Sequence, residues 1–166
     1  ITNISYAHSK NVRNIRQIAD AKAEIMNHIK SNGTIILNRD DNFYNYHKDI
    51  ALNKKLKIIS FGIRNKSSEV KLLKVKKIKN RYELFFNISG KLISLYSKTA
   101  NRSNLYNILA TLASINLYLN VDKLKKDIFL NLKIPDGRGD ISKIILGDKK
   151  IFLVDETYNS NPLSLK

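Results

Sequence analysis

Cysteine is absent from the 166-residue chain, which excludes disulfides and thiolate metal sites. No apolar run approaches the roughly 20 residues that a membrane span needs. The first residues also lack the basic and apolar regions of a signal peptide. We therefore expect a cytoplasmic protein without a membrane span. Hydrophobic residues make up 43% and charged residues 27%, which is typical of one soluble globular domain.

Acidic residues are few, since 14 Asp and Glu stand against 30 Lys and Arg and give a net charge of +16. A basic nucleic-acid-binding module is therefore one alternative. However, the lysines are scattered apart from one run between Lys71 and Lys79, and Asn and Ile are about equally abundant. Those three residue types share A/T-rich codons, so genome base composition is another explanation. We expect no nucleic-acid partner.

The pattern of apolar residues predicts an α/β fold. Short apolar strands alternate with helical periodicity in the first part of the chain, which is typical of a mostly parallel sheet flanked by helices. Three further short strands read as an antiparallel meander forming a small sheet. The predicted elements are helix 12–30, strands 34–37 and 57–61, meander strands 70–77, 81–88 and 91–97, helix 103–119 capped by Ser103, and a hairpin 141–154.

Lys22 interrupts the apolar stripe of the first predicted helix, because it lies four residues after Ile18 and three before Ile25. On a buried face its ammonium would be costly and its pKa should fall. A neutral amine can react with carbon dioxide to form a carbamate. The alternative is a lysine whose stem packs while its head stays in water. Of the histidines, His28 and His47 have no supporting neighbours and are predicted to be surface residues.

The stretch 149–162 combines a strand, two acids and a helix start. Ile151 to Val154 form an apolar run that predicts a buried strand, and Asp155 and Glu156 follow at its carboxyl end. Open α/β sheets bind their ligands at that end. Asn161 and Pro162 are then typical of an N-cap and a first helical position. The stretch therefore indicates a nucleotide or substrate edge.

Several of these segments resemble sequence motifs of the Mur ligase family. D-E-T-Y-N-S-N-P at 155–162 resembles D-(D/E)-(S/T)-Y-N-A-N-P, the form found in the Mur ligases that add D-alanyl-D-alanine to UDP-N-acetylmuramoyl-tripeptide. Four other segments match family motifs. They are Ile4–His8 (N-I-x-x-A-H-L), Ala21–Ile25 (A-K-G-E-I), Asn104–Ala110 (H-N-x-x-N-x-L-A-A without its first residue, which is Ser103 here) and Pro135–Arg138 (P-G-R with one inserted residue).

The resemblance implies ATP and Mg²⁺ as cofactors and a role for particular residues. His8 and a carbamoylated Lys22 would hold magnesium, and this would explain a lysine on an apolar stripe. Lys22 and Arg138 would be catalytic, Arg138 by stabilising charge on the γ-phosphate. The nucleotide would also contact Asn107 (adenine), Glu156 (ribose) and Tyr158, Asn159 and Asn161 (adenine and the hinge to the next domain). The turn 33–41 resembles G-x-x-x-L-N-x-D-D and is predicted to be structural, because Asp and Asn favour turns.

The resemblance also implies the place of this chain in a larger protein. We expect residues 1–166 to be the C-terminal portion of a Rossmann-like central ATP-binding domain. The Gly-rich phosphate loop and the N-terminal UDP-binding and C-terminal domains are absent from it, so the fragment alone should be inactive. The parent would be a monomeric ATP-dependent ligase of peptidoglycan synthesis. The alternatives are a sibling Mur ligase or a folylpolyglutamate or cyanophycin synthetase relative.

Overall fold

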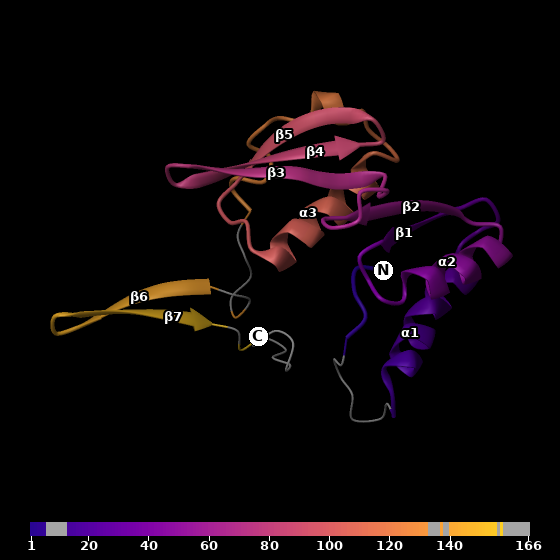
Figure 1. Ribbon diagram of the computed structural model, residues 1–166, viewed down its shortest axis with the longest axis horizontal. Coiled ribbons are helices and arrows are strands. Elements are labelled where there is room, and N and C mark those ends of the chain that lie inside the picture. Colours follow the sequence, from indigo (N-terminus) through magenta and orange to yellow (C-terminus); the bar gives the residue numbers. More distant parts are fainter. Residues whose placement is uncertain (6–12, 133–136, 138–139, 156, 158–166) are drawn as a thin grey trace.

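The computed structural model describes residues 1–5, 13–132, 137, 140–155 and 157, with the backbone alone at 140 and 141. Its elements follow one another along the chain as shown in Figure 1. They are α1 (Ile15–Ala23), the 3₁₀ helix η2 (Glu24–His28), β1 (Thr34–Asn38), α2 (Tyr44–Asn53), β2 (Lys57–Gly62), β3 (Val70–Ile78), β4 (Arg81–Ile88), β5 (Lys91–Ser97), α3 (Arg102–Ile115), the 3₁₀ helix η3 (Val121–Lys123), β6 (Asp140–Leu146) and β7 (Lys149–Asp155).

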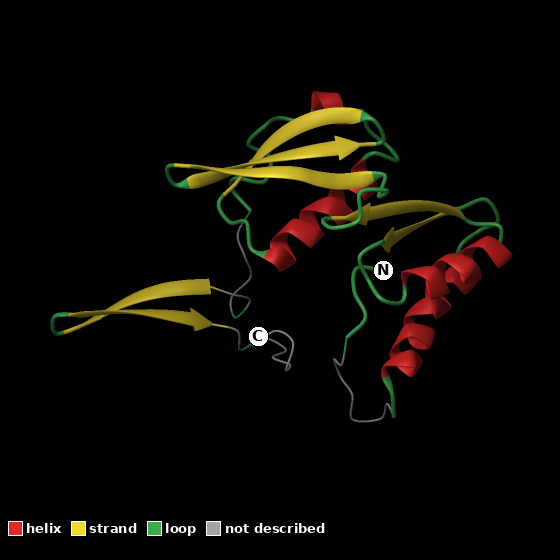
Figure 2. Cartoon of the chain, in the orientation of Figure 1, coloured by secondary structure: helices red, strands yellow, loops and turns green. Residues whose placement is uncertain are grey.

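Strands β1 to β5 form one mixed sheet in the order of the sequence (Figure 2). β1 and β2 pair in parallel, and β2 pairs in parallel with the first residues of β3, Phe61 with Val70 and Gly62 with Lys71. β3, β4 and β5 then pair antiparallel. The α/β prediction and the meander are both confirmed. The meander continues the parallel strands in one sheet, instead of forming a separate small sheet.

Helices cover both faces of the parallel strands. Ile35 and Leu37 of β1 pack with the cluster that includes α2 and η2. Ile36, between them in the sequence, packs with Ile59 of β2 against the cluster that includes α3. Because alternate residues of a strand point to opposite faces, α2 and α3 lie on opposite sides of the sheet.

The largest core lies between α3 and the inner face of the meander. Burying a large apolar side chain contributes about 1.5–3 kcal/mol, so this cluster holds α3 firmly on the sheet. The helix predicted over 103–119 is confirmed with an apolar stripe over its first three turns, but it ends four residues early, at Ile115. The buried side chains of the cluster include Phe61, Leu84, Phe86, Ile88 and Leu95 from the sheet and Leu105, Ile108, Leu109 and Leu112 from α3.

The first predicted helix is shorter than expected. α1 ends at Ala23 and continues as the 3₁₀ helix η2. A 3₁₀ helix has 3.0 residues per turn instead of 3.6, so the predicted apolar stripe loses its register after Ala23. Ile25, predicted to be buried, is 57% exposed, and Lys22 is exposed as well.

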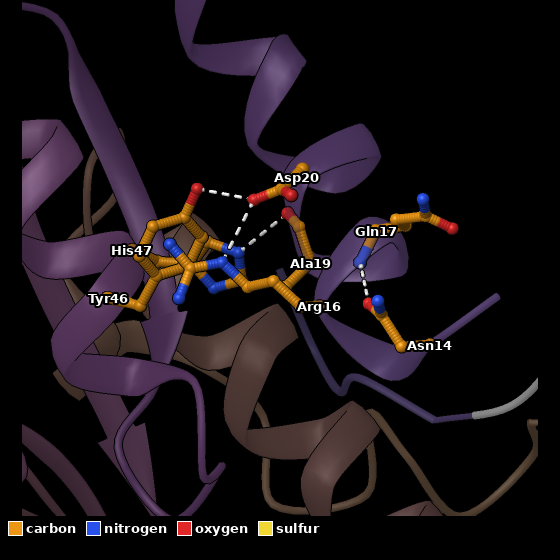
Figure 3. A network of polar contacts seen from close by, with 7 residues as sticks. All are labelled: Asn14, Arg16, Gln17, Ala19, Asp20, Tyr46 and His47. Atoms are coloured by element: carbon orange, nitrogen blue, oxygen red, sulfur yellow. Dashed lines mark hydrogen bonds and ion pairs between the residues drawn. The ribbon is translucent and has the colours of Figure 1, made fainter. Parts of the chain in front are cut away.

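α1 and α2 are held together by a polar network that includes a buried histidine (Figure 3). His47 of α2 is 2% exposed, and its Nε2 lies 3.0 Å from the carbonyl oxygen of Ala19, to which it must donate. Beside it, the Tyr46 hydroxyl donates to Asp20, which also accepts from Arg16. The prediction of a surface position for His47 was therefore wrong, whereas His28 is exposed as predicted.

β6 and β7 form a separate two-stranded antiparallel hairpin that stands apart from the five-stranded sheet (Figure 1). The predicted hairpin is confirmed, but the predicted burial of Ile151 to Val154 was wrong, since these four side chains are 42–66% exposed. Figure 1 shows no described helix or strand lying against this hairpin, which leaves both of its faces open. None of the described helices is long and apolar enough to cross a membrane.

Candidate functional site

A cavity of about 400 Å³ lies at the carboxyl end of β1. This is the edge where parallel strands of α/β proteins deliver loops and bind ligands. Three segments form its walls: the N-terminal segment, the turn that follows β1, and the first turns of α3. The lining residues are Thr2, Asn3, Ile4 and Ser5 from the first, Asn38, Asp40 and Asp41 from the second, and Arg102, Ser103, Tyr106 and Asn107 from the third.

The turn after β1 holds the N-terminal segment through Asn38 and Asp41. The Asn38 side-chain amide donates to the carbonyl oxygen of Thr2 over 2.7 Å. Asp41 Oδ2 accepts from the backbone N–H of Ile4 (2.8 Å), and its Oδ1 accepts from the N–H of Phe43 (2.8 Å). These bonds fix the segment that leads toward residue 8 as one wall of the cavity.

Asp40, which lies between Asn38 and Asp41 in the sequence, is hydrogen-bonded to the loop that follows β2. Its Oδ2 accepts from the backbone N–H of Ile63 (2.6 Å) and of Arg64 (2.9 Å), and its Oδ1 from the N–H of Asn65 (2.8 Å). The Tyr106 hydroxyl donates to Oδ2 over 2.9 Å. Partial burial alone would raise the pKa of this carboxyl, but the three N–H donors and the Tyr106 hydroxyl together hold it below its ordinary value. Asp40 is therefore an anion at neutral pH.

Gly62 allows this arrangement because it has no side chain. A Cβ at this position would lie 3.0 Å from Asp40 Oδ1 and 2.7 Å from Ser68 Oγ. Since real Cβ atoms almost never approach other atoms as closely as 2.7 Å, a larger residue would have to displace the Ser68 hydroxyl, and the Asp40 carboxylate would have to shift by a few tenths of an ångström. The missing side chain of Gly62, at the end of β2, therefore leaves room for the Asp40 carboxylate.

The start of α3 places one asparagine, Asn107 of its second turn, at the cavity. The N-cap is Asn101, whose side chain accepts from the N–H of Asn104 over 2.8 Å, so the prediction of Ser103 as the cap was wrong. The cap lies two residues earlier than that prediction, and Ser103 falls in the first turn of the helix. Asn104 is committed to the preceding loop, since its amide donates to the carbonyl oxygen of Thr99. Asn107 is exposed and lines the cavity.

Tyr106 lies between the two parts of the site. Its ring is half-buried, with the Arg102 guanidinium carbon 5.7 Å from the ring centroid. Burial and the hydrogen bond to the Asp40 carboxylate raise the pKa of the Tyr106 hydroxyl, and Arg102 opposes them. The hydroxyl therefore keeps its proton at neutral pH and stays a donor to Asp40.

Lys22 lies on the outer side of the N-terminal segment. Its side chain is exposed, and its Nζ donates to the carbonyl oxygen of Asn3 over 2.8 Å. The buried amine is therefore not found, and Lys22 corresponds to the alternative of a lysine whose head stays in water. Of the residues singled out from the sequence, Asn107 lines the cavity, whereas Lys22 of α1 contacts the lining residue Asn3 without lining the cavity itself. The others lie outside the described residues: His8, Arg138, Glu156, Tyr158, Asn159 and Asn161.

The described residues do not by themselves form a magnesium site. No group of three His, Asp or Glu side chains in this part of the chain is placed to hold a metal ion. Asp40 and Asp41 already accept hydrogen bonds from N–H groups, and the Lys22 amine is not an oxygen ligand of the kind Mg²⁺ prefers. A carbamate on Lys22 would supply such oxygens, and its exposed amine is accessible for that reaction.

Comparison with known proteins gives a consistent result. The family model of the Mur ligase middle domain matches residues 1–115. A curated relative, UDP-N-acetylmuramoyl-tripeptide--D-alanyl-D-alanine ligase of Rickettsia prowazekii, is 31% identical over 173 aligned residues, which cover 100% of this chain and 36% of the relative. The chain thus spans about a third of the length of the curated relative it matches.

Solved structures share the fold. A crystal structure of MurF from Acinetobacter baumannii superposes with a TM-score of 0.81 at 23% identity, covering 99% of this chain and 34% of the other. The MurF ligase of Thermotoga maritima in complex with ADP superposes with a TM-score of 0.70 at 21% identity, covering 98% of this chain and 35% of that protein.

Proposed function

Since this chain belongs to the Mur ligase family, we propose that it forms part of the ATP-binding domain of a ligase that adds D-alanyl-D-alanine to UDP-N-acetylmuramoyl-tripeptide. The 31% identity to a relative of that name along the whole chain supports this choice of substrates. The activity belongs to the intact protein, because residues 1–166 correspond to about a third of such a ligase.

The observation that carries the proposal is the cavity at the carboxyl end of β1. It is about 400 Å³ in volume, large enough for a nucleotide base and sugar. Asn107 presents an amide, which can both donate and accept, as recognition of adenine requires. Arg102 adds a positive charge at the same wall. The Thermotoga maritima relative with ADP bound supports a nucleotide as the ligand.

In the proposed reaction, ATP phosphorylates the tripeptide carboxylate to an acyl phosphate. The amine of D-alanyl-D-alanine attacks the acyl carbon, and the tetrahedral intermediate collapses to the amide and inorganic phosphate. The protein contributes by positioning the reactants and neutralising phosphate charge. Asn107 would hold the adenine, and Arg138 the γ-phosphate. The remaining nucleotide contacts in the proposal are Glu156, Tyr158, Asn159 and Asn161.

Magnesium would be held by His8 and a carbamoylated Lys22. The contact between Lys22 Nζ and the Asn3 carbonyl supports this, because it keeps the amine against the segment that leads toward His8. The bound ion would neutralise phosphate charge. The protein's own part is to keep the Lys22 side chain on that segment and accessible to carbon dioxide.

The proposal is tested by measuring phosphate release from ATP by the intact protein with UDP-N-acetylmuramoyl-tripeptide and one amine at a time. We expect release with D-alanyl-D-alanine and only background with diaminopimelate, lysine or glutamate. Release with one of those three amines instead would assign the chain to a sibling ligase. Absence of release with all amines, together with salt-sensitive binding of DNA or RNA, would overturn the proposal in favour of a nucleic-acid-binding module.

A further inference from the structure

The turn after β1 forms one wall of the cavity and is hydrogen-bonded to the other two, the N-terminal segment and α3. Asp40 is its link to α3. We propose that Asp40 is a positioning residue that acts through Tyr106 to set where Asn107 and Arg102 meet the nucleotide. This inference rests on the proposed function of the cavity. The sequence predicts only a structural role for this turn, whereas the inference gives it a role in nucleotide affinity.

Asp40 is suited to be a fixed anchor. Three consecutive backbone N–H groups, from Ile63 to Asn65, donate to its carboxylate, and the Arg64 guanidinium donates to its backbone carbonyl over 3.0 Å. Its position is therefore set by the backbone that leaves β2, at the same edge of the sheet as the cavity. A carboxylate with this many donors neither rotates freely nor needs a ligand to be satisfied.

Tyr106 transmits this position to α3. Its hydroxyl reaches Asp40 across 66 residues of sequence. Tyr106 is adjacent to Asn107 and four residues after Arg102, so Arg102 and Tyr106 share one side of the helix. Arg102 and Asn107 both line the cavity. The buried stripe of α3 fixes the helix against the sheet, while the Tyr106 bond fixes its cavity side against the turn.

Asp40 is not itself a ligand for the nucleotide. Its Oδ2 accepts three hydrogen bonds and its Oδ1 one, and its negative charge would repel phosphates. Its effect on the nucleotide must therefore pass through Tyr106. Tyr106→Phe removes the bond between them and Asp40→Asn removes the charge that fixes it. Combining the two substitutions should then cost little more affinity than the more damaging one alone.

The test uses the intact protein with Asp40→Asn, Tyr106→Phe and the double variant. ADP affinity is measured by titration calorimetry, and KM for ATP and kcat by phosphate release. Each single variant should raise the Kd for ADP and the KM for ATP by roughly fivefold to tenfold, the effect of losing one charge-assisted hydrogen bond. The kcat should change by less than about twofold. Tyr118→Phe is the matched control, since Tyr118 is 85% exposed and is not among the residues that line the cavity.

The double variant decides between positioning and independent contacts. A Kd for the double variant close to that of the weaker single variant supports the inference, whereas multiplied effects overturn it. Variants indistinguishable from Tyr118→Phe, or a fall in kcat with KM unchanged, also overturn it. If Asp40→Asn does not fold, Tyr106→Phe, which keeps the buried ring, decides by its Kd alone. Wild-type protein that neither binds ADP nor releases phosphate would instead refute the proposed function itself.

Discussion

Acid should loosen the loop after β2 through Asp40. The pKa of this carboxyl is held below its ordinary value of 3.8, because the three N–H donors and the Tyr106 hydroxyl outweigh the opposing effect of burial. A carboxyl whose pKa is lower in the folded state stabilises the fold at pH values above its ordinary pKa. That contribution is lost as the pH falls from about 5 through the folded pKa.

The size of the effect follows from the hydrogen bonds. Asp40 accepts four of them, three from the backbone of residues 63–65 and one from Tyr106. A hydrogen bond to a charged group contributes about 1 kcal/mol more than a neutral one. Asp40 is only partly buried, so solvent screening reduces the sum to about 2 kcal/mol. This corresponds to roughly a 30-fold change in the local opening equilibrium.

Hydrogen exchange of the backbone amides of Ile63, Arg64 and Asn65 measures this opening directly, in the intact protein and without unfolding it. Asp40→Asn should speed their exchange roughly 30-fold at pH 7. The ratio between variant and wild type cancels the intrinsic pH dependence of exchange. This ratio should start to fall below about pH 5 and approach one as the wild-type carboxyl takes up its proton.

A ratio that stays constant between pH 7 and about pH 3 would refute this reasoning, because the stabilisation would then not depend on the charge of Asp40. Amides of β4 serve as an internal control. Their ladder bonds to β3 and β5 do not involve Asp40, so the ratio for those that exchange by local opening should stay near one at every pH.

Three further predictions concern residues that the structure places differently from the sequence pattern. His47→Ala should lower the free energy of unfolding by about 2–4 kcal/mol, because it removes a buried ring and its bond to α1, while the exposed His28→Ala should be neutral in denaturant titration. Asn101→Ala should cost about 1 kcal/mol in the same assay and Ser103→Ala almost nothing, and the reverse order would show that Ser103 is the cap after all. Lys22→Ala should abolish phosphate release yet leave thermal stability unchanged, since its exposed side chain makes one hydrogen bond, and full activity would remove Lys22 from the mechanism.

Much of the fold could be predicted because its signals are local. The stripe of α3 repeats at helical spacing, and the meander strands alternate and are joined by short polar turns, so both predictions are confirmed. The first helix was predicted too long because the sequence pattern at Ile25 fits 3.6 residues per turn, whereas the chain there forms a 3₁₀ helix. Hydrophobic spacing cannot distinguish the two over a single turn.

The site was predictable only in part because its contacts are distant in sequence. A turn at residues 38–41 was expected from its Asn and Asp residues. The donors to Asp40 lie 23 to 66 residues away, and no local pattern indicates them. His47 illustrates the same limit, since its partner Ala19 is 28 residues away and offers only a backbone carbonyl. The Gly62 position was the available signal, because a glycine ending a buried strand often marks a close approach of another group.

The short pairing between β2 and β3 leaves an open sheet border that carries the run of lysines. Only the first two residues of β3 pair with β2, while β4 pairs along its whole other side. The rest of β3 is therefore a border of the sheet, and no described strand pairs with it on the side away from β4. Apolar side chains there are exposed, Leu73 by 52% and Val75 by 38%. Such a border invites edge-to-edge association between molecules, and lysine is the residue that most often prevents it. Lys74, Lys76 and Lys77 are all exposed along it. The positive charge of these three lysines would oppose edge-to-edge pairing of this border with a neighbouring copy of the protein.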